Sequence, residues 1–182
     1  MDKNMSLFIA LTFNDEVKNN ICELIVRLRS SSLQGKFSAR ANLQSTLVFI
    51  EDHADIDAIK AAMDDIKSEH FTLDLGGYGI LKKRTGNVHW AGIRHSDNLD
   101  ALRNELFEVF KAHGVPCDTE AEFKPYLILG RDVVTAQTFN PATFLRSVPK
   151  QQQEVVDITL MQSGYDADGR QAYTPLYVKT LA

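Results

Sequence analysis

The stretch FKPYLILGRD (residues 123–132) holds a short apolar strand that opens after a proline and closes on an Arg-Asp pair. Tyr126 and Ile128 lie two positions apart within it. Side chains two apart on a strand point to the same face of the sheet. The stretch therefore predicts a strand that presents Tyr126 beside Ile128 on one surface.

A similar arrangement occurs earlier, in ANLQSTLVFI (residues 41–50), where Gln44 and Thr46 are also two positions apart. In both places a predicted helix leads through a connector to the strand, first over residues 15–50 and again over 97–131. Two similar halves that face each other would place these strands on opposite walls of one cleft. We therefore expect the two residue pairs to meet across a cleft.

Length and composition describe an ordinary soluble protein of 182 residues, 44% hydrophobic and 24% charged, which we expect to form a single bilobal domain over residues 1–182. No apolar run reaches the roughly 20 residues that a membrane span needs. The net charge of −4 argues against avid nonspecific binding of nucleic acid. Cys22 and Cys117 form neither a disulfide framework nor a metal-ligand spacing, which favours the reducing cytoplasm.

Periodicity and capping residues predict the order of strands and helices along the chain. We expect strands at residues 7–13, 43–50, 70–75, 87–95, 123–130, 154–163 and 173–181. Helices are expected after Asn14, within EDHADIDAIKAAMDDI (51–66) with His53 near its start, and over 97–113. Gly76 and Gly77 predict a bulge before a further short strand. The residues between Gly35 and Leu43 are expected to be a connector, and those from 131 to 153 to be irregular.

Five segments, taken in order, resemble the LigT-like 2H phosphoesterases, the family of bacterial RNA 2',3'-cyclic phosphodiesterases also called 2'-5' RNA ligases. The resemblance covers nearly the whole chain and is carried by LFIALTFNDEVK, NLQSTLVFIED, VHWAGI, FKPYLILGRD and YTPLYVKTL. It implies an α+β fold with two pseudo-symmetric lobes. Each lobe would be an antiparallel sheet backed by helices, and the two would enclose a central cleft.

The family is named for two His-x-Thr motifs, which the resemblance implies to be catalytic, and this chain departs from both. Gln44 stands at the first His position with Thr46 retained, whereas Tyr126 and Ile128 stand at the second His and Thr positions. Hydrolysis of a cyclic phosphodiester needs a base and an acid, and histidine serves as either near neutral pH. The amide of Gln44 has no pKa suited to proton transfer, and the phenol of Tyr126 is a poor base at neutral pH. We therefore expect little or no His-dependent hydrolysis.

Arginines near the two motifs are candidates for binding phosphate. The resemblance implies this role for Arg131, and Arg40 precedes the first motif strand; the alternative for Arg131 is an ion pair with Asp132. We interpret Trp90 as a core residue. The five histidines, including His53, show neither an HxH nor an HExxH spacing, so we expect no metal site and no cofactor.

Three functions remain open. The first is a pseudoenzyme whose cleft binds a nucleotide or an RNA end through its phosphate. The second is an active cyclic phosphodiesterase that uses Tyr126 as an acid, and the third is a protein-interaction domain whose cleft has no ligand. We favour the first, and we expect a cytoplasmic monomer with no membrane partner.

Overall fold

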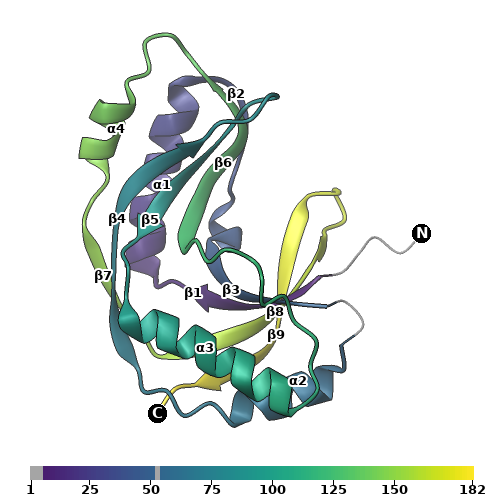
Figure 1. The fold of residues 1–182 in the computed structure, drawn as a ribbon. Helices are drawn as coiled ribbons and strands as arrows, with labels where there is room; N and C mark the ends of the chain where they lie inside the picture. Colours follow the sequence, from purple (N-terminus) through teal and green to yellow (C-terminus); the bar gives the residue numbers. More distant parts are fainter. Residues whose placement is uncertain (1–5, 52–53) are drawn as a thin grey trace.

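The computed structural model describes residues 6–51 and 54–182, which form two antiparallel sheets with helices on their outer sides (Figure 1). The first sheet has the strand order β3-β1-β8-β9. Its members are β1 (Leu7–Thr12), β3 (Gln44–Ile50), β8 (Asp157–Tyr165) and β9 (Gln171–Thr180). The β8–β9 hairpin extends away from the helices and carries the turn at residues 166–169.

The second sheet has the order β2-β6-β5-β4-β7. Its members are β2 (Ser32–Phe37), β4 (Phe71–Leu81), β5 (Asn87–Ile93), β6 (Tyr126–Thr135) and β7 (Gln151–Val155). The register of β4 against β5 shifts between Leu75 and Tyr78, where Gly77 has a positive φ of 91°. The glycine pair therefore forms the predicted bulge, although the strand continues through it.

Four helices cover the sheets: α1 (Asp15–Ser30), α2 (Ile56–Asp64), α3 (Asp97–Ala112) and α4 (Pro141–Ser147). Helix α1 packs on β2 and β6, whereas α2 and α3 pack on each other and on the first sheet. Asn14 accepts a hydrogen bond from the Val17 amide and so caps α1, as predicted. No described helix is both long and apolar enough to cross a membrane.

The predicted α+β fold with two antiparallel sheets is confirmed, and the helices were placed correctly except for α4. One large cluster of buried apolar side chains draws on both sheets and on all four helices. Fully buried members include Ile9 of β1, Leu28 of α1, Leu73 of β4 and Leu106 of α3. The core therefore joins the two halves, and the cleft described below lies to one side of it.

Three stretches were predicted wrongly. The expected connector begins within β2, an edge strand whose sequence SLQGKF has little apolar character. The expected irregular stretch contains α4 and the start of β7. The expected single strand at 154–163 is two strands in different sheets. Val156, which is 47% exposed, separates them, so the apolar run EVVDITL conceals a change of sheet.

Candidate functional site

A cleft of about 1090 Å³ lies between the two sheets, and both predicted motif strands contribute to its walls. Gln44 and Thr46 line it from β3, and Tyr126, Ile128 and Arg131 line it from β6. The structure therefore brings together five of the six residues that the sequence singled out. Strands β3 and β6 belong to different sheets but approach each other directly.

The β3 wall presents two polar side chains to the cleft. Gln44 and Thr46 are half-buried, whereas the alternate residues Ser45 and Leu47 are buried. This alternation directs the first pair to the same face. Among the described residues, no side chain or backbone group forms a hydrogen bond with the side chain of Gln44 or Thr46. Both groups are therefore available to a ligand.

The β6 wall is aromatic and apolar. Tyr126 stacks on Trp90 of the neighbouring strand β5, with ring centroids 5.5 Å apart and an interplanar angle of 30°. Ile128 lies directly across from Trp90 in the ladder between the two strands. Trp90 is half-buried on this face, so the expectation that it belongs to the core is wrong. Its neighbour His89 points to the opposite face and is buried there.

Arg131 is an exposed residue of β6 that lines the cleft. Its side chain forms no hydrogen bond or ion pair within residues 6–51 and 54–182, since Asp132 pairs instead with Lys36 at 3.2 Å. Burial raises the pKa of Tyr173 on β9, and the charge of Arg131 opposes that rise. The guanidinium therefore acts electrostatically on the opposite sheet.

Comparisons with known proteins place this geometry in a family. An RNA 2',3'-cyclic phosphodiesterase of Thermotoga maritima is 28% identical over 138 residues, which is 70% of each chain. The enzyme of the same name from Archaeoglobus fulgidus is 25% identical over 87% of this chain and 91% of its own. The crystal structure of E. coli LigT complexed with 3'-AMP superposes with a TM-score of 0.71 at 26% identity, covering 97% of this chain and 98% of LigT.

The chain is similar in sequence and in fold to the LigT-like 2H phosphoesterases. No family model matches it. The agreement in fold over nearly the whole length of LigT shows that this chain and LigT share the same overall architecture.

Arg40, the sixth predicted site residue, does not line the cleft of this LigT-like protein. Its guanidinium donates to the carboxylate of Asp15, at 2.8 Å, and to the side chain of Asn19. Both partners belong to α1, so Arg40 ties the turn before β3 to that helix. Of the two arginines predicted to bind phosphate, Arg131 alone stands at the cleft.

The cleft is positively charged although the whole chain carries a net charge of −4. Among the described residues, five cationic side chains line it, against three carboxylates. The cationic residues are Lys36, Arg103, Lys124, Arg131 and Arg170. A concave surface with this balance attracts anions, including phosphate esters.

Arg103 of α3 lines the cleft and also supports it, a role that was not predicted from the sequence. Its guanidinium lies between the rings of Phe107 and Phe123, 4.7 and 4.6 Å from their centroids. It donates to the carbonyl oxygens of Leu47 on β3, at 2.9 Å, and of Ala121, at 3.0 Å. Arg103 therefore fastens the loop that leads into β6 to the back of β3. An arginine at one position of an amphipathic helix carries no sequence signal for this role.

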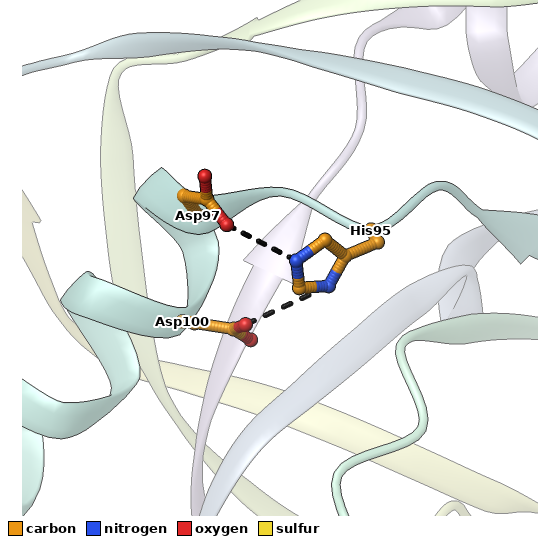
Figure 2. Close-up of side chains that lie close together, drawn as sticks. All are labelled: His95, Asp97 and Asp100. Carbon is orange, nitrogen blue, oxygen red and sulfur yellow. Dashed lines mark hydrogen bonds and ion pairs between the residues drawn. The ribbon is translucent and has the colours of Figure 1, made fainter.

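A cluster of possible metal ligands lies outside the cleft, at the start of α3. His95, Asp97 and Asp100 come together there (Figure 2). The Nε2 atom of His95 lies 3.1 Å from Asp97, and its Nδ1 atom lies 3.6 Å from Asp100. One ligand atom of each residue lies within 4.8 Å of the other two, although the two carboxylates face different ring nitrogens of His95. The spacing H-x-D-x-x-D of these residues differs from both the HxH and the HExxH spacing.

Proposed function

We propose that the cleft binds a nucleotide or an RNA end through its phosphate, and that it performs little or no hydrolysis by histidine acid–base chemistry. One observation carries this proposal. Gln44, Thr46 and Arg131 converge on one positively charged cleft, and none of their side chains has a hydrogen-bond partner within the described part of the chain. Polar groups left unpaired at a concave surface are suited to hold a polar ligand.

The three side chains suit a phosphate ester. The Arg131 guanidinium offers a planar fork of donors that matches two phosphate oxygens, and the Thr46 hydroxyl and the Gln44 amide each add a donor. E. coli LigT has been solved in complex with 3'-AMP, with NADP+ and with ATP. These three ligands share phosphate groups and an adenosine. The family resemblance thus supports a nucleotide as the ligand here.

The histidines that lie in the described part of the chain are all placed away from the cleft lining. His70 faces Glu154, His95 faces Asp97 and Asp100, and His113 faces Asp65. His89 is buried on the far face of the second sheet, and His53 lies outside the described residues. No described imidazole is therefore in position to transfer a proton in the cleft.

The three carboxylates of the cleft are already engaged by nearby groups. Asp118 accepts hydrogen bonds from the amides of Glu120 and Ala121, and Asp166 accepts them within its own turn. Glu122 pairs with Lys124 at 3.0 Å. These contacts hold the carboxylates locally, which favours a binding cleft over a hydrolytic one.

Thermal denaturation with adenosine 3'-monophosphate and with adenosine 2',3'-cyclic monophosphate tests the proposal. A ligand that binds only the folded state stabilises it by about 2.7 kcal/mol at 100 times its Kd, so Tm should rise with ligand concentration. Thr46→Val, which removes the hydroxyl and keeps the shape, should reduce the rise. Thr72→Val, at an exposed position of β4, is the matched control and should not. Absence of any rise in the unaltered protein would contradict the proposal.

A further inference from the structure

We propose that Trp90 and Tyr126 form a platform on which the base of the bound nucleotide stacks. The platform rests on the proposed function, since it presupposes that a nucleotide occupies the cleft. It goes further in assigning recognition to the base as well as to the phosphate.

The platform is built across three adjacent strands. Trp90 of β5 and Tyr126 of β6 are stacked, and Gly79 of β4 lies beneath the indole. A Cβ atom at Gly79 would come within 2.0 Å of the indole Cζ2, so the ring lies directly on the strand because that residue is glycine. Gly92, opposite Tyr126 in the ladder, adds no side chain beside the phenol. The backbone thus orients both rings in advance of binding.

The two rings are not used in the core. Trp90, Tyr126 and Ile128 are half-buried, and none of them belongs to or packs against the clusters of buried apolar residues in the described structure. Tyr126 and Ile128 line the cleft, and Trp90 packs beside them on the neighbouring strand. Apolar side chains at a cleft wall, apart from the core, form a surface for an apolar partner. A nucleobase has such a face and stacks well on aromatic side chains.

The platform and the polar groups lie on facing walls. Tyr126 is on β6, and Gln44 and Thr46 are on β3, which approaches β6 across the cleft. A nucleotide whose base lies on Tyr126 can thus direct its phosphate toward the side chains of β3. This arrangement also accounts for the tyrosine at position 126. Hydrolysis would need a residue there that can both donate and accept a proton, whereas base stacking needs an aromatic ring.

The chain contains one tryptophan, so its fluorescence reports directly on the platform. A base stacked at the Trp90–Tyr126 pair is expected to quench this emission. Adenosine 3'-monophosphate should do so saturably, whereas ribose 5-phosphate, which has a phosphate but no base, should bind more weakly and leave the emission unchanged. Affinities for both probes are measured in parallel by calorimetry.

Substitution of Tyr126 separates base binding from phosphate binding. Tyr126→Leu should weaken the binding of adenosine 3'-monophosphate by about 5-fold to 150-fold, the range expected for the loss of one stacking contact. It should leave the affinity for ribose 5-phosphate unchanged. Tyr126→Phe keeps the ring and should restore nucleotide affinity. Tyr177→Leu removes a tyrosine that contacts Asp64 away from the cleft, and serves as the matched control.

Three results would overturn the platform. Equal affinity for the two probes, with unchanged tryptophan emission, would overturn it while leaving phosphate binding intact. An equal loss of affinity for both probes in Tyr126→Leu would do the same, because it would show that Tyr126 maintains the shape of the cleft and does not bind the base. Failure of the unaltered protein to bind either probe would overturn the proposed function, and the platform with it.

Discussion

Asp132 pairs with Lys36, at 3.2 Å, and not with its sequence neighbour Arg131. Asp132 has a positive φ of 51°, the only such value among the described residues other than glycine, and this bend lies where β6 shifts register against β2. The pair with Lys36 is exposed and adds little stability. Its consequence is electrostatic, since Arg131 keeps an uncompensated charge beside the cleft.

Replacing Arg131 by Gln should weaken binding of adenosine 3'-monophosphate by about 10-fold or more, because hydrogen bonds to charged groups contribute about 1.5–3 kcal/mol. Calorimetric titration measures the loss. Arg40→Gln removes the same charge from a residue that is bound to Asp15 outside the cleft, and it should change the affinity little. Equal weakening by the two substitutions would show that overall charge, and not the position of Arg131, determines binding.

Gly79→Ala should disturb the platform, because its Cβ would overlap the Trp90 indole. Overpacking of this kind costs about 1–3 kcal/mol of unfolding free energy, which urea denaturation measures. The emission of Trp90 should shift as the indole is displaced. Gly164→Ala, in a strand position where a Cβ meets no atom within 4 Å, is the matched control and should be nearly neutral. An unchanged emission and stability in Gly79→Ala would show that the indole does not rest on β4.

Because His89 is buried, we expect the protein to lose stability in acid. It is 1% exposed, its Nδ1 lies 2.5 Å from the Tyr78 hydroxyl, and its Nε2 has no hydrogen-bond partner among the described residues. Burial lowers the pKa of His89 and raises that of Tyr78. The unfolded chain therefore takes up the His89 proton at a higher pH than the folded protein does. The free energy of unfolding should fall as the pH decreases below about 6.5, by at most about 1.4 kcal/mol per pH unit from this group.

Urea denaturation of the unaltered protein and of His89→Gln, from about pH 7 to about pH 5, isolates this contribution. Glutamine retains a hydrogen-bonding group for Tyr78 but does not titrate. The unaltered protein should lose stability relative to the variant as the pH falls. Parallel curves would mean that His89 takes up its proton at the same pH in the folded and the unfolded states, which would contradict the prediction.

The parts of the fold with strong local signals could be predicted from the sequence. The apolar run of β1 and the cap at Asn14 are such signals, and so is Gly114, which has a positive φ of 67° just after α3. Strand β2 gave no such signal, because an exposed edge strand needs no apolar face. The change of sheet at Val156 depends on which strands pair, and pairing is decided by contacts far apart in the sequence.

The same limit applies to the site. The residues of the two motif strands could be predicted, because spacing two apart on a strand directs side chains to one face. The importance of Trp90 could not, because a tryptophan in a strand fits a core equally well. Only the pairing of β5 with β6, and the glycine beneath the indole on β4, place it against Tyr126, which lines the cleft. The role of Arg103 likewise depends on its hydrogen bonds to two carbonyl oxygens that lie far from it in the sequence.

The most direct test of the central claim, a nucleotide-binding cleft without its proton-transfer groups, is hydrolysis of an oligonucleotide that ends in a 2',3'-cyclic phosphate. The unaltered protein is assayed beside the triple variant Gln44→His, Tyr126→His, Ile128→Thr, and binding of the same oligonucleotide is measured for both. We predict binding by both proteins and a rate at least about 100-fold higher in the variant, in line with the usual contribution of general acid–base catalysis. Rapid hydrolysis by the unaltered protein would contradict the claim.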